Sequence, residues 1–244
     1  MYLAFLIAFI IYIVAIAVKG ELKTRKLLNA TVTEKTKVKG YLRTVAFGWI
    51  TLLVLLTICL FASISFVDIG LRPLSFDYNV WFTATILALC TLALALLLYQ
   101  AISPKYKKTV QEDFDKADKS KHGKVMEAIM PRTRKEKIAF TGSALTASIY
   151  EEILARGFLF YILQMQFPNL SIIFVVLITS ALFGAAHFYQ GIQGIITTTL
   201  AGILLGFLFV VTGSLIPAIL LHFFINFSPV FYLKEESTDN KILP

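Results

Sequence analysis

The longest uncharged stretch of the chain limits what the chain can fold into. From Gly157 to Leu233, 77 consecutive residues contain no Asp, Glu, Lys or Arg. The hydrocarbon core of a bilayer is about 30 Å thick and takes roughly 20 apolar residues per spanning helix. This stretch alone therefore has room for three spans, and a water-soluble domain is excluded. We expect an all-α, polytopic integral membrane protein.

The composition agrees with that class. Of the 244 residues, 57% are hydrophobic and 16% are charged, and the mean hydropathy is +0.76. Soluble domains have about 45–50% apolar and about 25% charged residues. Disordered, collagen-like and disulfide-scaffold proteins are excluded as well. Cys59 and Cys90 lie in separate apolar runs without CxxC spacing, which indicates two buried hydrophobic side chains.

Apolar segments predict a helical bundle of about seven transmembrane helices. They cover residues 1–18, 44–67, 81–102, 138–166, 170–188, 192–211 and 215–233. The chain then divides into three parts. Residues 1–137 form a three-span region with two basic cytoplasmic loops, residues 138–233 form a helical core, and residues 234–244 form a short cytoplasmic tail.

The basic residues predict the orientation of these helices. Eight Lys and Arg lie in 19–43 and eleven in 103–137, each group bordered by apolar runs, and such loops face the cytoplasm. With seven spans, 21 of the 23 basic residues lie on that side and only Arg72 on the other. We predict an N-terminus outside and a C-terminus inside. Short external loops favour a bacterial cell membrane. The net charge of +8 indicates contact with anionic lipids, not nucleic acid.

Three charged side chains lie in the middle of the fourth predicted span. Glu151, Glu152 and Arg156 would each cost about 2.5–3.5 kcal/mol at the centre of an inserted helix, so partners or a function are expected. Glu152 and Arg156 are four residues apart, which predicts an ion pair. Glu151 is rotated by about 100° and has no local cation. We expect it to face a cavity or a neighbouring helix, as a catalytic base or as part of an ion-pair cluster that joins helices.

Two histidines lie on later spans. His187 follows Gly184-Ala185-Ala186, small residues that let another helix approach closely. His222 and Asn226 are four residues apart and share one face of the last span. Such groups either join helices by hydrogen bonds or converge on a reaction centre. Together with the carboxylates they can activate water, carry a proton and stabilise an oxyanion, which suits hydrolysis of an acyl bond within the membrane.

In this order and on separate spans, the motifs resemble those of a known family. The family is the CAAX-protease and bacteriocin-processing (CPBP) group of intramembrane proteases, which includes the type II CAAX prenyl endopeptidases. The matching residues are Glu151-Glu152-x-x-x-Arg156, Phe183-x-x-x-His187 and His222-x-x-x-Asn226. The resemblance covers roughly residues 138–233, and residues 1–137 carry none of these motifs.

The resemblance implies an intramembrane endopeptidase with defined residue roles. Glu151 would activate water, and His187 would assist and pass a proton to the leaving amine. Glu152 and its arginine partner would orient the site, and His222 with Asn226 would bind the oxyanion. The substrate would be a peptide or protein, with or without an attached lipid.

The resemblance leaves metal dependence and activity open. Glu151, His187 and His222 could hold zinc with an open coordination position. We favour a mechanism without a cofactor, because an adjacent glutamate pair with an arginine partner suits a carboxylate base better than a ligand cluster. Two other classes remain: a non-catalytic bacteriocin-immunity or scaffold membrane protein, and a proton-coupled transporter, because buried carboxylates and histidines also form proton relays. The oligomeric state is unknown.

Overall fold

The computed structural model describes residues 1–28, 32–117 and 129–233, and within these ranges every regular element is a helix. The all-α prediction is confirmed, whereas the predicted tail, 234–244, lies outside the described residues. The helices are α1 (Tyr2–Leu28), α2 (Glu34–Phe61), α3 (Val80–Ile102), α4 (Pro104–Ala117), α6 (Arg134–Glu152), the π-helix η1 (Ile153–Leu159), α7 (Phe160–Gln166), α8 (Ile172–Ala186), the 3₁₀ turn η2 (Phe188–Gln190), α9 (Gly191–Thr212), α10 (Leu215–Phe227) and α11 (Pro229–Tyr232).

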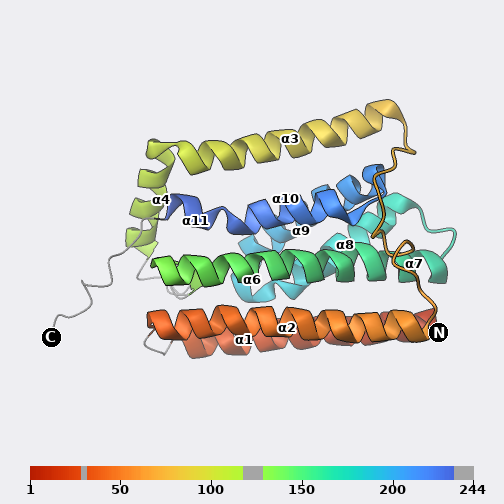
Figure 1. Ribbon diagram of the computed structural model, residues 1–244, viewed down its shortest axis with the longest axis horizontal. Helices are drawn as coiled ribbons and strands as arrows, with labels where there is room; N and C mark the ends of the chain where they lie inside the picture. The colour runs from red at the N-terminus through yellow and green to blue at the C-terminus, as the bar shows by residue number, and fades with distance from the viewer. Residues whose placement is uncertain (29–31, 118–128, 234–244) are drawn as a thin grey trace.

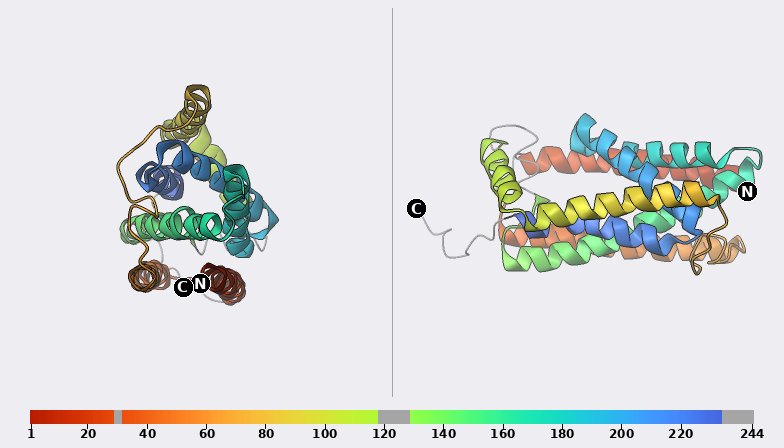
Figure 2. Two further views of the ribbon diagram at one scale, coloured as in Figure 1. Left: turned by 90° about the vertical axis from the view of Figure 1, so that its right-hand side faces the viewer. Right: turned by 90° about the horizontal axis from the view of Figure 1, so that it is seen from above.

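The long helices lie side by side in one bundle (Figure 1). α6 packs against α2 and against α10, and α9 packs against α8, α10 and α3. The end-on view in Figure 2 shows α1 and α2 as one outer layer, with α3 at the opposite side of the bundle. α4 crosses one end of the bundle (Figure 1). The core helix is therefore the continuous run of α6, η1 and α7, with other helices on both sides.

Four helical segments are long and apolar enough to cross a membrane, by length and composition. They are Tyr2–Lys26, Glu34–Phe61, Val80–Ile102 and Phe188–Thr212. Two further apolar segments, Ile172–Ala186 and Leu215–Phe231, are shorter. These helices indicate a multi-pass membrane protein. The count of seven spans stays a prediction.

The first two helices reach further toward the basic loop than the apolar segments do. α1 continues ten residues past Val18 to Leu28, because that stretch is rich in Lys, Glu, Leu and Arg, which are good helix formers. Glu21 and Arg25 pair there at 2.9 Å. α2 begins at Glu34 because Thr33 forms a capping box with the first turn. Apolar content therefore predicted the positions of these two helices but not where they begin and end.

α2 ends at Phe61, six residues before the predicted end at residue 67. Ser63 has a φ of 55°, a left-handed conformation that interrupts a helix. Beyond it, the Ser65 backbone N–H and hydroxyl both donate to the Asp68 carboxylate, at 2.8 and 2.7 Å. Serine and aspartate side chains compete with helical hydrogen bonds in this way. The last predicted span is likewise divided after Phe227, because Pro229 cannot continue a helix.

A loop between α2 and α3 covers one end of the core. Gly157 lies within η1, and a Cβ there would be only 2.8 Å from the carbonyl oxygen of Ile69 in this loop. The loop also reaches the turn between α9 and α10, where Arg72 Nε donates to the carbonyl oxygen of Gly213 at 2.6 Å. A side chain at Gly157 would separate η1 from the loop. The N-terminal region and the helical core therefore pack as one unit.

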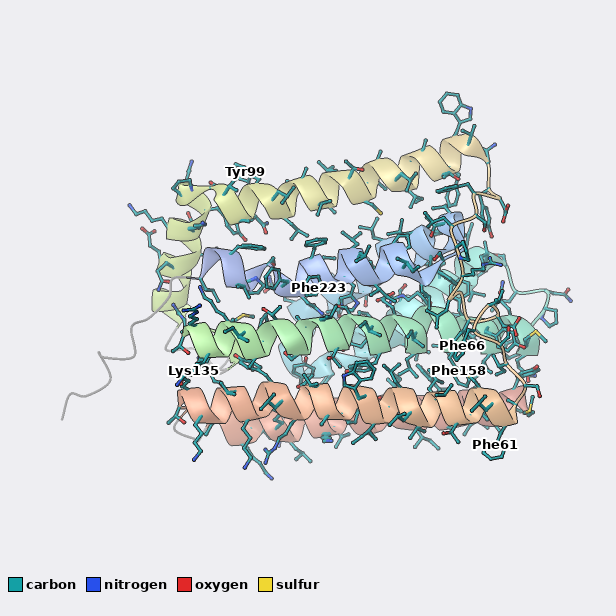
Figure 3. All side chains as sticks on the ribbon, in the orientation of Figure 1. Phe61, Phe66, Tyr99, Lys135, Phe158 and Phe223 are labelled. Carbon is teal, nitrogen blue, oxygen red and sulfur yellow. The ribbon has the colours of Figure 1, made fainter. Side chains whose placement is uncertain are left out.

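The opposite end of the bundle, where Figure 3 labels Lys135, contains a buried charged cluster between α2 and α6. The Glu136 side chain is 2% exposed and accepts a hydrogen bond from the Arg132 backbone N–H at 2.7 Å. It also forms a capping box with Thr133, which starts α6 four residues before the predicted start at 138. Lys37 Nζ lies 3.6 Å from Glu136 and donates to the carbonyl oxygen of Met130 at 2.9 Å.

Replacing Glu136 is expected to destabilise the protein. In Glu136→Ala the buried donors around the carboxylate lose their acceptor, so the free energy of unfolding should fall by about 1–3 kcal/mol. Thermal unfolding in detergent measures the change as a lower Tm. Lys135→Ala is the control: its side chain is 80% exposed beside Glu34, and exposed pairs contribute little. Equal Tm shifts in the two variants would contradict the role of the buried cluster.

Candidate active site

The predicted ion pair forms in the middle of the core helix. Arg156 Nη1 lies 2.8 Å from Glu152 Oε1, and both side chains are fully buried. Arg156 Nη2 donates to the carbonyl oxygen of Gly202 on α9 at 3.0 Å. The guanidinium also lies over the Phe183 ring, 4.5 Å from its centroid. Arg156 therefore joins η1 to both α8 and α9.

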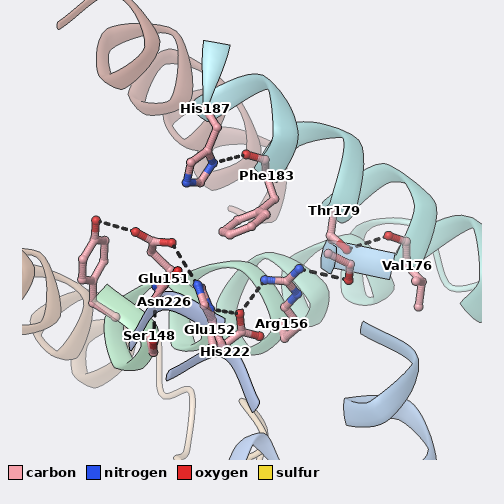
Figure 4. Close-up of polar contacts among 12 residues, drawn as sticks. Ser148, Glu151, Glu152, Arg156, Val176, Thr179, Phe183, His187, His222 and Asn226 are labelled. Atoms are coloured by element: carbon pink, nitrogen blue, oxygen red, sulfur yellow. Dashed lines mark hydrogen bonds and ion pairs between the residues drawn. The ribbon is translucent and has the colours of Figure 1, made fainter. Parts of the chain in front are cut away.

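His222 extends this pair toward Glu151 (Figure 4). Its Nδ1 lies 2.7 Å from Glu152 Oε1, and its Nε2 lies 3.8 Å from Glu151 Oε2. A carboxylate only accepts hydrogen bonds, so Nδ1 donates to Glu152. The same Glu152 oxygen also receives the Arg156 hydrogen bond. The two glutamates, the arginine and one histidine thus form one connected row inside the bundle.

Glu151 faces a cavity, as expected from its rotation away from the ion pair. Its Oε1 accepts a hydrogen bond from the Tyr150 hydroxyl at 3.0 Å, and its side chain is 18% exposed, compared with 0% for Glu152. The cavity has a volume of about 110 Å³. The lining residues come from α1, α6, η1, α8 and η2: Phe9, Tyr12, Ile13, Ile16, Tyr150, Glu151, Leu154, Ala155, Leu159, Thr179, Phe183, Ala186, His187 and Tyr189.

His187 lines the same cavity from the end of α8. Its Nδ1 lies 2.8 Å from the carbonyl oxygen of Phe183. A carbonyl oxygen only accepts, so Nδ1 carries the proton and Nε2 is the nitrogen left for chemistry. The preceding Gly184 brings α9 close, since a Cβ at that position would lie 2.9 Å from the carbonyl oxygen of Ile195. The predicted close helix approach beside His187 is confirmed.

Asn226 lies one turn beyond His222 on α10. Its Nδ2 is 3.4 Å from Ser148 Oγ on α6, and it is not among the residues that line the cavity. The structure therefore brings five of the six predicted residues together: four in the connected row, with His187 facing Glu151 across the cavity. Asn226 stands beside this group with a serine partner.

The helices that carry these residues match a known family. Residues 134–228 match the family described as Type II CAAX prenyl endopeptidase Rce1-like. These residues form an Rce1-like domain. The match contains all six predicted site residues, and the resemblance to the CPBP family is confirmed. No curated protein and no solved structure is significantly similar to the chain.

In the Rce1-like domain, the side chains that the sequence suggested as zinc ligands are not placed as one metal-binding group. Across residues 1–28, 32–117 and 129–233, no three His, Cys, Asp or Glu side chains are placed to hold a metal ion. His187 and His222 each use only Nδ1 for a hydrogen bond, to Phe183 or to Glu152, so Nε2 of each remains as a possible ligand atom. No step below depends on a metal.

Two contributions to the site were not predicted from the sequence. Tyr150, directly before Glu151, donates to its carboxylate. α1, outside the Rce1-like domain, supplies one wall of the cavity through Phe9, Ile13 and Ile16. Their spacing of four and three residues marks one helix face, but most residues of α1 are apolar, so the face did not stand out. Which helix covers a cavity depends on tertiary packing.

Proposed function

We propose that this protein is an intramembrane endopeptidase in which Glu151 and His187 activate water to hydrolyse a peptide bond. The observation that supports this most strongly is the shared cavity: a carboxylate and an imidazole line one small space inside a helical bundle. The Rce1-like family provides the second support, because it indicates a peptidase that acts on protein or peptide substrates. Glu151 lies 3.8 Å from His222 Nε2 through Oε2 and keeps part of its side chain, 18%, exposed beside the cavity.

Glu151 and His187 carry out different proton transfers. Glu151, as a carboxylate, takes a proton from the attacking water, and general bases of this kind typically contribute about 10²–10⁴-fold in rate. His187 holds one proton at Nδ1, so its neutral Nε2 accepts the proton that Glu151 took from water and delivers it to the amine nitrogen as the C–N bond breaks. The fixed hydrogen bond to Phe183 keeps Nε2 turned toward the cavity.

His222 and Asn226 supply donors for the oxyanion. His222 donates to Glu152 through Nδ1, so it can donate to an oxyanion through Nε2 only when both nitrogens are protonated. The charges permit this, since two carboxylates, one guanidinium and one imidazolium sum to zero, and buried charges must be balanced. The Asn226 amide nitrogen has two hydrogens. One reaches Ser148, and the other serves the oxyanion.

The proposal includes the arrangement in the membrane. With seven spans, the N-terminus lies outside and the C-terminus in the cytoplasm of a bacterial cell. Support comes from the bundle itself, because the end of α1, the start of α2, α4 and the start of α6 meet at one end (Figure 1). These segments contain the basic residues of 19–43 and most of those of 103–137, as the positive-inside rule requires.

α1 is expected to select the substrate side chain that enters the cavity. The cavity volume of about 110 Å³ is less than the roughly 150 Å³ of a cavity known to bind benzene, so a large aromatic side chain should be excluded. Ile13→Ala enlarges the space. The ratio of kcat/KM for a peptide with Phe over one with Ala beside the scissile bond should rise about tenfold or more.

The control for this selectivity lies on the same helix. Ile10 is 44% exposed on the outer face of α1 and does not line the cavity, so Ile10→Ala should leave the ratio unchanged. A ratio that changes equally in both variants would show that α1 acts through general stability and not through the cavity wall.

Cleavage by the purified protein tests the proposed function directly. Prenylated and unprenylated peptides are incubated with detergent-solubilised protein, with and without a chelator, and products are identified by mass spectrometry. We expect cleavage at a single bond that survives chelation. A protein that is folded and cleaves none of the peptides would contradict the proposal and favour a scaffold or immunity protein.

A further inference from the structure

Tyr150 connects the reacting carboxylate to a helix outside the Rce1-like domain. Its hydroxyl donates to Glu151 Oε1 at 3.0 Å, although its ring is only 8% exposed. The ring packs edge-on against Phe47 of α2, with centroids 6.1 Å apart and planes at 87°. A residue that holds the proposed base is thus itself held by α2.

Gly48 makes this contact possible. A Cβ at Gly48 would lie 2.6 Å from Thr146 Cγ2 and 2.7 Å from Tyr150 Cδ1, distances that atoms in real side chains do not tolerate. α2 therefore approaches α6 closely at this level, and the phenol ring fills the space against the glycine. With the ring fixed between Phe47 and Gly48, the hydroxyl has a defined position beside Glu151.

We propose that Tyr150 is the positioning residue for Glu151 and that α2 is part of the catalytic apparatus because it fixes Tyr150. This inference rests on the proposed endopeptidase function. It assigns a role to a residue outside the three family motifs and to a helix outside the family match.

The hydrogen bond determines which carboxylate oxygen reacts. The terminal torsion of glutamate is broad, so the carboxylate of Glu151 has little preferred orientation of its own. Tyr150 holds Oε1, and Oε2 then faces His222 Nε2 at 3.8 Å. The oxygen near the oxyanion donors is therefore the one that takes the proton from water. Without the hydroxyl, the carboxylate samples other orientations and the fraction in the reactive geometry falls.

The test is Tyr150→Phe, which removes the hydroxyl and keeps the ring. A hydrogen bond to a charged group of this strength corresponds to about a 10- to 100-fold effect. We expect kcat to fall by that factor while KM stays within about twofold, because the cavity keeps its shape. Tyr41→Phe is the matched control: Tyr41 is also 8% exposed, and its hydroxyl donates to a backbone carbonyl far from the site. Its kcat should not change.

Gly48→Ala tests the part played by α2. The added methyl meets Thr146 Cγ2 as well as the Tyr150 ring, and the displaced ring should lower kcat in the same direction. In the Tyr150→Phe background, Gly48→Ala should lower kcat much less than it does in the wild-type protein, since both changes act through one hydrogen bond. Unchanged thermal unfolding separates these effects from a loss of folded protein.

Three results would overturn the inference. A folded Tyr150→Phe protein with wild-type kcat shows that the hydroxyl does not position Glu151. An increase in KM at constant kcat shows that Tyr150 binds substrate instead. Independent, additive effects of Gly48→Ala and Tyr150→Phe show that α2 acts by another route. All three leave cleavage by the wild-type protein intact, whereas a wild-type protein without cleavage would refute both the inference and the proposed function.

Discussion

Glu151→Gln is expected to reduce peptide cleavage by about 10²–10⁴-fold, the contribution typical of a general base. The amide has nearly the same shape as the carboxylate and can still accept the Tyr150 hydrogen bond at its oxygen, but it cannot take a proton from water. Substrate binding should therefore survive while kcat falls. Single-turnover cleavage of a reporter peptide, with protein in excess, measures the chemical step without a contribution from product release.

A matched substitution elsewhere separates loss of the base from loss of a negative charge. Glu112 lies on α4, its side chain is 51% exposed, and it pairs only loosely with Lys108 at 3.8 Å. Glu112→Gln should keep wild-type kcat and Tm. If Glu151→Gln turned over substrate normally, the base would have to be another group in the cavity. His187→Ala would then be expected to carry the full loss.

The core helix shows which kind of contact can be predicted from the sequence. The four-residue spacing of Glu152 and Arg156 predicted a contact that depends only on neighbouring turns, and the pair is present at 2.8 Å. It persists although the backbone changes to a π-helix at Ile153. π-turns are common at functional sites, but no residue pattern in this stretch marked one.

Contacts between distant segments could not be predicted from the sequence. The hydrogen bond from His222 to Glu152 joins residues 70 positions apart, and α1 meets the cavity from more than 130 positions away. Apolar residues predicted that these helices pack, but hydrophobic burial is not directional, so it does not predict which faces meet. Only the charged and polar residues within the apolar segments, too costly to bury without partners, indicated where the helices converge.

Arg156→Met is expected to produce the largest loss of stability. It leaves the fully buried Glu152 carboxylate without its guanidinium, and removal of one partner from a buried ion pair costs about 3–5 kcal/mol. Thermal unfolding in detergent should show a much lower Tm. Glu21 and Arg25 form the matched control pair, because they have the same four-residue spacing at 2.9 Å but the arginine is 69% exposed. Arg25→Met should shift the Tm little.

The double variant Glu152→Met/Arg156→Met separates stability from orientation. Replacing both members of a buried pair with apolar side chains is often neutral or stabilising, so the Tm should return toward that of the wild-type protein. Cleavage should remain lost, because His222 Nδ1 no longer has the carboxylate that fixes its proton and its ring. A double variant with restored activity would show that the pair only holds the helices together. Restored stability without activity would show that burying these charges, at a cost to folding, serves to orient His222.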